Sequence, residues 1–275
     1  MSNTIKIGEL TVNRLGFGAM RVLGDSNIWG PPKDPANARK VLRRAYELGA
    51  NFFDTAESYG PHTDEIVIAE AMHPYPKDLV IGTKCGLVRP KPSRWDEDAR
   101  PEKLRKDLEG SLKRLKLDCL HLWQLHAPDP KVPLEESLGV MVDAQRAGKV
   151  RHIGVSNFSV KELERARKVA NIVSVQNRYS LGDRAEEDVL AHCQKLGIAF
   201  LPWYPLGAGS ALKISRLKKV GERVKATPAQ LAIAWLLAKS PVMLPIPGTG
   251  SIEHLEENMA AAKLKLSKEE LAALD

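Results

Sequence analysis

Cysteine is scarce in this sequence, and metal-binding patterns are missing from it. Only three of the 275 residues are cysteines: Cys85, Cys119 and Cys193. Their number is odd, none belongs to a CxxC pair, and no group of histidines and cysteines has the spacing of a zinc site. The sequence therefore argues against a disulfide scaffold, indicates a reduced intracellular protein, and predicts that no metal is bound.

Long hydrophobic runs are missing as well. No stretch approaches the roughly 18 unbroken apolar residues of a membrane span. Residues 1–8 contain no apolar core of a signal peptide. We therefore expect a cytoplasmic protein that does not enter a membrane.

The charge is not concentrated in a block of one sign. Lysine and arginine number 41 against 34 aspartates and glutamates, a net charge of +7. Acids and bases alternate along segments such as residues 101–107, which is typical of solvated helix faces. We therefore expect no nucleic-acid partner, and the positive excess suits a pocket for an anionic cofactor. The same helix-face interpretation is preferred for Lys213, Arg216, Lys218 and Lys219, with a position over the phosphates of such a cofactor as the alternative.

What the sequence does contain is an alternation of strand-like and helix-like segments along its whole length. Amphipathic stretches, such as the helix face with Leu104, Leu108, Leu112 and Leu115, separate short apolar runs. Eight such β-α units predict an α/β fold, a parallel sheet closed into a (β/α)8 TIM barrel, with residues 1–275 as a single domain. The expected strands are residues 14–18, 50–53, 79–83, 119–125, 150–155, 172–176, 199–202 and 242–245.

Two further patterns bear on this fold. Residues 5–12 resemble a β-hairpin with its turn near Gly8 and Glu9, and we expect this hairpin to plug the amino-terminal end of the barrel. A doubly wound open sheet is the rival architecture. However, residues 16–21 do not complete the GxGxxG pattern expected of its first βα turn.

Four polar residues stand at or just beyond the ends of expected strands: Asp54, Tyr59, Lys84 and His126. The carboxyl-terminal strand ends of a parallel barrel converge on one mouth, where active sites form. A phenol beside an ammonium, a carboxylate and an imidazole can donate a proton without a metal or a thiol. We therefore expect these side chains to form a catalytic site.

The segments around these residues resemble the motifs of one family, the aldo-keto reductases, which are NAD(P)H-dependent carbonyl reductases on a (β/α)8 barrel. Residues 53–60 resemble the family's aspartate and tyrosine motif, residues 83–86 its lysine motif, and residues 124–128 its histidine motif. Residues 155–158 and 175–177 resemble its two carboxamide-binding segments. The motifs follow the family's order, and the resemblance covers essentially the whole chain.

The resemblance implies a role for each of the four residues. Tyr59 would protonate the alkoxide that forms when hydride reaches a carbonyl carbon. Lys84 would lower the pKa of Tyr59, and Asp54 would keep the lysine charged and oriented. His126 would hydrogen-bond the substrate oxygen. Taken singly, each residue also has a simpler interpretation, such as a helix cap for Asp54 or a strand-end cation for Lys84.

The resemblance also implies a site for the nicotinamide of NADP(H). Ser156, Asn157 and Gln176 would bind its carboxamide, although the first two could also serve only as turn and helix-cap residues. Trp203 would stack on the ring, with Tyr204 as the competing aromatic residue.

The rest of the dinucleotide is expected along the loops that follow the last two strands. A small-residue loop that leads into a helix N-terminus, as at residues 246–251, is a typical phosphate site. The family's best-known pattern places lysine and arginine at the 2′-phosphate of NADP, whereas this chain has Gly248 and His254 there. NADP(H) is therefore expected, with NAD(H) as the alternative. The residues implied at the pyrophosphate, 2′-phosphate and adenine are Leu206, Gly207, Gly209, Gly248, Thr249, His254, Glu257 and Asn258.

Fewer residues point to the substrate. Met20, Trp29 and Trp95, in two long loops, would wall the pocket. The chain stops at Asp275 without the long C-terminal segment that covers the pocket in many family members, so we expect an open site. The expected substrate is a small carbonyl compound, with pyridoxal-like or small aromatic aldehydes as candidates, and the protein is expected to be a monomer.

Two other functions stay open on this evidence. One is a non-catalytic nicotinamide-binding or regulatory module on the same fold, and the other is a phosphate-binding barrel isomerase. Neighbouring residues also have plain interpretations. Glu57 is interpreted as a solvated loop carboxylate, Cys85 and His121 as packing residues, and His62 as either pocket wall or loop surface.

Overall fold

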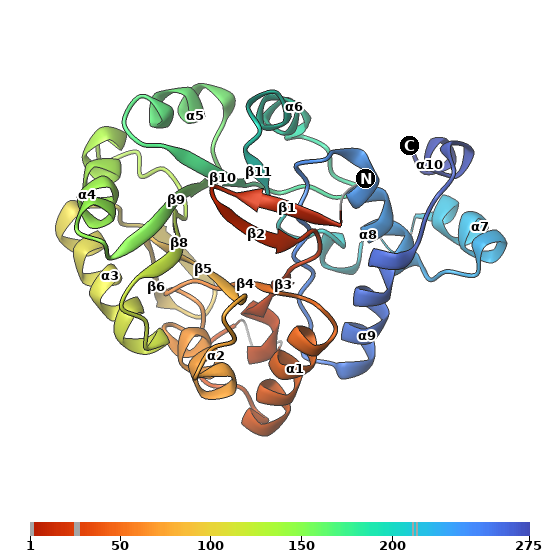
Figure 1. Ribbon diagram of the computed structural model, residues 1–275, viewed down its shortest axis with the longest axis horizontal. Helices are drawn as coiled ribbons and strands as arrows, with labels where there is room; N and C mark the ends of the chain where they lie inside the picture. Colours follow the sequence, from red (N-terminus) through yellow and green to blue (C-terminus); the bar gives the residue numbers. More distant parts are fainter. Residues whose placement is uncertain (1–2, 25–27, 211, 213) are drawn as a thin grey trace.

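Seven parallel strands form one curved sheet in which neighbouring strands follow the chain order. Helices cover the outside of this ring (Figure 1). The computed structural model describes residues 3–24, 28–210, 212 and 214–275. Within these residues, no helix combines the length and the apolar character needed to cross a lipid bilayer. The sheet strands are β3 (Phe17–Gly18), β4 (Phe52–Asp54), β5 (Val80–Cys85), β8 (Leu120–Leu125), β9 (Val150–Ser156), β10 (Ile172–Gln176) and β11 (Ala199–Phe200). The α-helices are α1 (Pro35–Glu47), α2 (Thr63–Met72), α3 (Pro101–Leu115), α4 (Leu134–Arg146), α5 (Val160–Arg167), α6 (Glu187–Leu196), α7 (Ser215–Val224), α8 (Pro228–Lys239), α9 (Ile252–Ala260) and α10 (Lys268–Leu274).

The ring closes through the segment predicted as the eighth strand. Phe200 N donates to Val242 O at 2.8 Å on one side, and Gly16 N donates to Pro245 O at 2.9 Å on the other. Pro245 and Pro247 have no N–H to donate, so a continuous ladder cannot form here. The predicted barrel is therefore confirmed, whereas the expectation of a regular eighth strand is wrong.

An amino-terminal hairpin, β1 (Thr4–Ile7) and β2 (Leu10–Asn13), closes one end of the barrel and lies across the ring in Figure 1. Its turn has the predicted position, with a φ of 61° at Gly8 that glycine adopts without strain. Ile7 is fully buried and packs in one cluster with residues of the barrel interior, such as Phe52. The predicted plug is confirmed.

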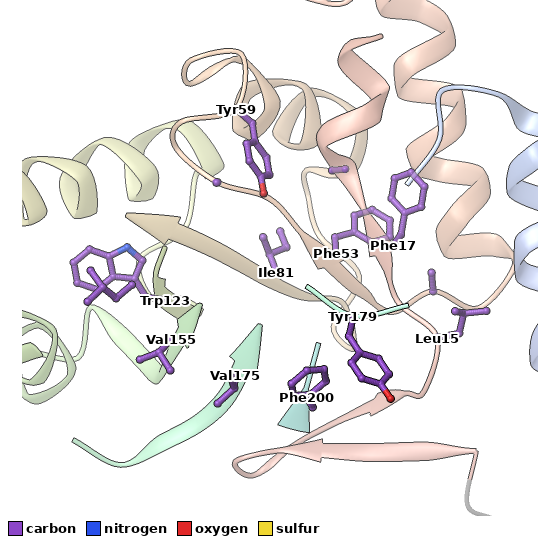
Figure 2. Packing of buried hydrophobic residues seen from close by; sticks show 14 of the residues in the cluster. Leu15, Phe17, Phe53, Tyr59, Ile81, Trp123, Val155, Val175, Tyr179 and Phe200 are labelled. Carbon is purple, nitrogen blue, oxygen red and sulfur yellow. The ribbon is translucent and has the colours of Figure 1, made fainter. Parts of the chain in front are cut away.

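Alternation along the strands produces two separate cores. Phe52 belongs to the cluster inside the barrel, whereas its neighbour Phe53 packs in the cluster between the sheet and the helices. Figure 2 shows part of this outer cluster, with Trp123 and Tyr179 among its large aromatic side chains. Tyr59 belongs to the same cluster, so the core itself holds a predicted site residue.

A second hairpin follows β5, where the sequence predicted only a loop. β6 (Leu87–Lys91) and β7 (Arg94–Glu97) pair in antiparallel fashion. Pro90 and Pro92 hide the strand pattern, because proline is depleted in strands and cannot donate to a ladder. The hairpin extends from the carboxyl end of β5 and carries Trp95, so it forms part of the barrel mouth.

Two fully buried carboxylates stand at the start of α2. Thr55 Oγ1 donates to Asp64 Oδ2 at 2.7 Å. Thr83 Oγ1 and Arg114 Nε donate to the two oxygens of Glu65 at 2.6 and 2.7 Å. Burial, reinforced by the neighbouring charge of Glu65, raises the pKa of Asp64 to about 7. Asp64 therefore favours its protonated form much more in the folded chain than in the unfolded one.

Replacement of Asp64 by asparagine should remove this pH dependence. A raised folded-state pKa contributes stability that is fully present below the ordinary value of 3.8 and is lost as the pH rises to about 7. Between pH 4 and pH 7 the wild type should therefore lose up to about 4 kcal/mol of its free energy of unfolding through Asp64, and Asp64→Asn should not show this loss. Urea unfolding across this range measures the difference.

Asp143→Asn on α4 is the matched control, because it makes the same substitution at a side chain that is 70% exposed rather than buried. It should not reproduce the gain over wild type that is expected of Asp64→Asn. A difference between Asp64→Asn and wild type that stays constant with pH would contradict the prediction.

Candidate active site

The structure brings the four predicted catalytic side chains together at the mouth of the barrel. Asp54 and Lys84 lie on β4 and β5, while Tyr59 and His126 lie in the segments that follow β4 and β8. Lys84 Nζ lies 2.7 Å from Asp54 Oδ2 and 3.3 Å from the Tyr59 hydroxyl. The rings of Tyr59 and His126 meet edge-on, with centroids 5.8 Å apart. All four side chains are buried.

Further hydrogen bonds hold the ion pair in place. Lys84 Nζ also donates to the carbonyl oxygen of Thr55 at 2.9 Å. Asp54 Oδ1 accepts hydrogen bonds from Gln176 Nε2 at 2.8 Å and from Gln124 Nε2 at 3.4 Å. Two oxygen atoms, from Asp54 and Thr55, therefore accept hydrogen bonds from the buried ammonium, and two glutamine amides hold the Asp54 carboxylate in position. Gln124 was not predicted at the site, because nothing in the local sequence shows that it lies beside Asp54, 70 residues earlier in the chain.

Burial dominates the ionisation of these groups. It raises the pKa of Tyr59 well above 10, with a further contribution from the charge of Asp54. It lowers the pKa of Lys84, although Asp54 opposes this shift. Burial and the nearby Lys84 charge hold the pKa of His126 well below 6.5. The expectation that the pKa of Tyr59 is lowered is therefore wrong for the free protein, because desolvation and the charge of Asp54 both raise it.

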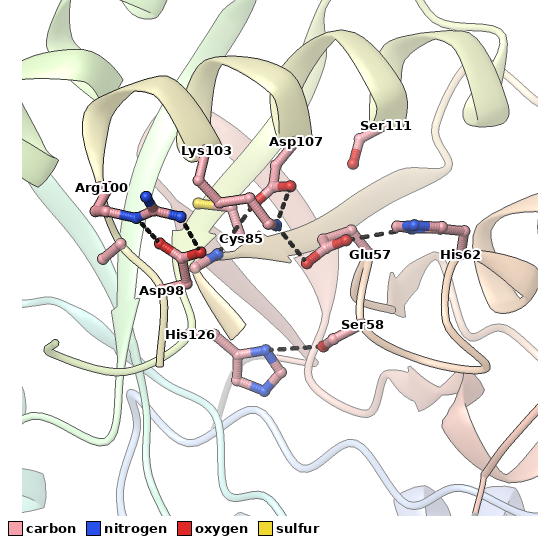
Figure 3. Close-up of polar contacts among 12 residues, drawn as sticks. Glu57, Ser58, His62, Cys85, Asp98, Arg100, Lys103, Asp107, Ser111 and His126 are labelled. Carbon is pink, nitrogen blue, oxygen red and sulfur yellow. Dashed lines mark hydrogen bonds and ion pairs between the residues drawn. The ribbon is translucent and has the colours of Figure 1, made fainter. Parts of the chain in front are cut away.

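Glu57 lies in a buried charged network beside the site rather than in solvent (Figure 3). It is only 2% exposed, and its two oxygens lie 3.4 Å from Lys103 Nζ and 3.2 Å from His62 Nδ1. Lys103 also forms an ion pair with Asp107, one turn further along α3. Burial and the nearby charge of Glu57 raise the pKa of Asp107 to about 6. The interpretation of Glu57 as a solvated carboxylate is wrong, since the chain after Asp54 turns it toward α3.

Two residues interpreted as packing groups have satisfied polar atoms. Cys85 is fully buried, and its Sγ lies 3.6 Å from the carbonyl oxygen of Gln124. His121 Nδ1 accepts a hydrogen bond from Ile81 N at 3.1 Å. Neither residue lies in the cavity described next.

A cavity of about 830 Å³ opens at the catalytic residues, and most of the predicted cofactor residues line it. Tyr59, Asp54 and His126 lie in its wall, whereas Lys84 lies behind Tyr59. Arg21 and Leu212 were not predicted to line it. The remaining predicted residues in the wall are Met20, Trp95, Ser156, Asn157, Gln176, Trp203, Leu206, Gly209, Gly248, Thr249 and His254.

One end of the cavity is formed by the predicted nicotinamide residues. Asn157 Nδ2 donates to the carbonyl oxygen of His126 at 2.9 Å, and Trp203 Nε1 donates to Asn157 Oδ1 at 3.0 Å. Ser156 Oγ donates to the carbonyl oxygen of Gln176 at 2.7 Å. Through Asn157, the indole of Trp203 is thus linked to the backbone of the catalytic residue His126. The binding of a carboxamide by Ser156, Asn157 and Gln176 stays a prediction.

The other end of the cavity reaches the N-terminus of α9. Ser251 caps this helix by accepting a hydrogen bond from His254 N, and Ser251 N donates to Thr249 Oγ1 at 3.0 Å. A neighbouring cavity of about 220 Å³ is lined by Glu257 and Asn258 together with residues shared with the larger one. This is the position predicted for the adenine end of a dinucleotide. Lys213, from the basic run, lies outside the described residues.

The predicted substrate residues separate into two groups. Met20 and Trp95 line the cavity, as does Leu87, which was not predicted. Trp29 lies behind this wall, with its ring centroid 5.5 Å from the guanidinium carbon of Arg89. The prediction that Trp29 itself walls the cavity is therefore not supported by its position.

Comparison with known proteins agrees with this geometry. Residues 14–275 match the Aldo/keto reductase family. An uncharacterized oxidoreductase of Schizosaccharomyces pombe is 45% identical over 275 residues, which is all of this chain and 89% of the relative. Pyridoxine 4-dehydrogenase of Escherichia coli is 44% identical over 284 residues, covering 100% of this chain and 98% of the relative.

Solved structures show the same fold. An aldo/keto reductase from Klebsiella pneumoniae in complex with NADP and acetate has a TM-score of 0.85 at 28% identity, and the match covers 100% of this chain and 95% of that one. The matches in sequence and in structure extend over the whole barrel and its mouth. The chain therefore belongs to the aldo/keto reductase family of oxidoreductases.

Proposed function

We propose that this protein reduces small aldehydes and ketones to alcohols with NADPH, and that Tyr59 supplies the proton. The observation that carries the proposal is the position of Lys84 Nζ, 2.7 Å from the Asp54 carboxylate and 3.3 Å from the Tyr59 hydroxyl, at the base of a cavity. A phenol, an ammonium and a carboxylate in this order can release a proton and stabilise the anion left behind.

Tyr59 has a proton to donate, because a phenol whose pKa is raised by burial is protonated at neutral pH. The shift by itself makes the phenol a weaker acid, so release of the proton depends on the neighbouring Lys84 ammonium. When bound, a nicotinamide would supply the hydride. Tyr59 would give its proton to the oxygen of the substrate, and the Lys84 ammonium, 3.3 Å from the hydroxyl, would stabilise the phenolate left behind. Solvent protons restore the phenol after the alcohol has left.

His126 is suited to hold the substrate oxygen. Burial keeps its imidazole neutral, since its pKa lies well below 6.5. A neutral imidazole offers one N–H donor and adds no second cation beside Lys84. Its ring lies in the cavity wall next to Tyr59, so one carbonyl oxygen can meet both donors.

The cavity fits a dinucleotide. Trp203, tethered through Asn157, offers an aromatic ring near Tyr59, and the capped N-terminus of α9 lies at the other end. The hydroxyl groups of Thr249 and Ser251 would bind the 2′-phosphate there, with His254 beside them. The Klebsiella relative binds NADP, which supports NADPH over NADH here. Because positions 248 and 254 hold glycine and histidine rather than lysine and arginine, we expect the preference for NADPH over NADH to be modest.

The same contacts argue against a purely regulatory module. Such a module needs a dinucleotide cavity but gains nothing from an ammonium buried beside a phenol, which costs desolvation energy. An isomerase needs no ring-binding wall such as Trp203. The substrate class that we propose is aromatic aldehydes resembling pyridoxal, because Trp95 lies beside Tyr59 and His126 and because the Escherichia coli relative is a pyridoxine 4-dehydrogenase.

Tyr59→Phe should abolish most of the activity while leaving the cofactor site intact. The substitution removes the proton donor but keeps the ring, and loss of a general acid lowers the rate by roughly 100- to 10,000-fold. The measurement is the loss of reduced-nicotinamide absorbance with an aromatic aldehyde, together with the Kd of NADPH, which should barely change. A variant that keeps most of its kcat would remove Tyr59 from the proposed mechanism.

His254→Arg should strengthen the preference for NADPH. Arginine presents a bidentate, charge-assisted donor to a 2′-phosphate, which histidine does not. We expect the Kd of NADPH to fall by roughly twofold to fivefold, as is typical of an added exposed charge contact of about 0.3–1 kcal/mol. Titration of the tryptophan fluorescence measures the Kd of each cofactor, and the Kd of NADH serves as the internal control. An equal change for both cofactors would place the 2′-phosphate away from residue 254.

A further inference from the structure

One indole in the wall of the cavity, that of Trp95, packs against a buried arginine. Trp95, on β7, is 37% exposed and lines the cavity. Its ring centroid lies 6.1 Å from that of Tyr59 and 6.3 Å from that of His126, with edge-on geometry in both cases. An aromatic ring attached to a carbonyl carbon between Tyr59 and His126 therefore reaches the indole.

Arg89, on the paired strand β6, lies over the ring of this indole. Its guanidinium carbon is 3.7 Å from the centroid of the Trp95 ring, which is stacking distance, and 5.5 Å from the centroid of Trp29. Although arginine is strongly polar, Arg89 is only 7% exposed. The cation therefore lies between two indoles that come from different loops of the barrel mouth.

Hydrogen bonds join the same guanidinium to both loops. Arg89 Nη1 donates to the carbonyl oxygen of Ile28 at 3.3 Å, and Nη2 donates to the carbonyl oxygen of Pro92 at the tip of its own hairpin. The first of these loops is anchored next to the proton donor, because Gly30 N donates to the carbonyl oxygen of Gly60 at 2.9 Å. Arg89 thus connects the β6–β7 hairpin to the segment that carries Tyr59.

We infer that Arg89 is a positioning residue that holds Trp95 beside the reacting carbonyl group, and that it thereby makes the enzyme favour aromatic carbonyl substrates over aliphatic ones of similar size. The inference rests on the proposed reductase function. An exposed indole on a short hairpin would otherwise move among rotamers and lose part of its stacking energy on binding. Stacking of a planar guanidinium on one face fixes the ring and leaves the remaining surface for a flat substrate.

The kinetic test compares two aldehydes with NADPH. Pyridine-4-carboxaldehyde can contact Trp95 with its ring, whereas butanal cannot stack. In Arg89→Met, which keeps an apolar side chain without the planar cation, the ratio of kcat/KM for the two aldehydes should fall by roughly threefold to tenfold. The loss should arise mainly from a higher KM for the aromatic aldehyde, because Arg89 does not touch the reacting atoms.

Arg94→Met is the matched control. Arg94 lies on the same hairpin, its side chain is 60% exposed, and it pairs only locally, with Asp96 at 2.7 Å in the described contacts. This variant should keep the wild-type ratio. Should Arg89→Met fail to fold, Arg89→Lys retains the charge while losing the planar fork, and the ratio should fall in the same direction. An unchanged ratio in a folded Arg89 variant, or an equal loss for both aldehydes, overturns the inference.

A second measurement separates this inference from the proposed function. Acrylamide quenching of the Trp95 fluorescence, taken as the difference between proteins with and without a Trp95→Phe substitution, needs neither cofactor nor turnover. Quenching should increase in Arg89→Met and stay at the wild-type level in Arg94→Met. If the wild-type enzyme reduces neither aldehyde, the proposed function fails. Unchanged quenching in Arg89→Met shows instead that Arg89 does not hold the indole, even when reduction occurs.

Discussion

The structure depends on a buried ion pair, the one between Lys84 and Asp54 at the carboxyl ends of β5 and β4. An ammonium without exposed surface is stable only when protein oxygens replace the water it has lost. Asp54 and the carbonyl oxygen of Thr55 do this directly, and Gln176 binds the other carboxylate oxygen. Together with Lys84 on β5, these partners come from three strands, because Asp54 and Thr55 belong to or follow β4 and Gln176 ends β10. The pair is therefore complete only when the barrel is formed, and loss of either partner would leave an uncompensated charge buried in the folded chain.

The parts of the fold that could be predicted from the sequence are those with local patterns. The leucine stripe of α3 and the glycine turn of the amino-terminal hairpin each lie within a few residues, and both have the predicted positions. The segment after Ser240 and the β6–β7 hairpin were misjudged in opposite directions, and prolines are involved in both. After Ser240 the prolines prevent the regular strand that was predicted, although single bonds such as Gly16 N to Pro245 O still order the chain. In the β6–β7 hairpin the prolines hide two strands that do pair.

The site shows the same division. That Asp54, Lys84 and His126 converge follows from parallel strands, which bring their carboxyl ends to one mouth. The surroundings of each group do not follow from sequence order. Glu57 meets Lys103, which lies 46 residues further on, and the ionisation of Tyr59 depends on how completely packing excludes water. Residue types therefore predicted which groups meet, whereas the direction of the Tyr59 shift required the packed structure.

Asn157 connects the two walls of the cavity before any ligand is bound. Its φ of 61° is left-handed, a conformation that asparagine tolerates better than most residues. From there one side-chain amide reaches both the backbone of His126 and the indole of Trp203. The separation between the substrate-oxygen side and the ring-binding side is thus set by covalent geometry and two hydrogen bonds. Most of the ordering entropy at these walls is lost during folding, so a ligand that enters later meets a surface already in place.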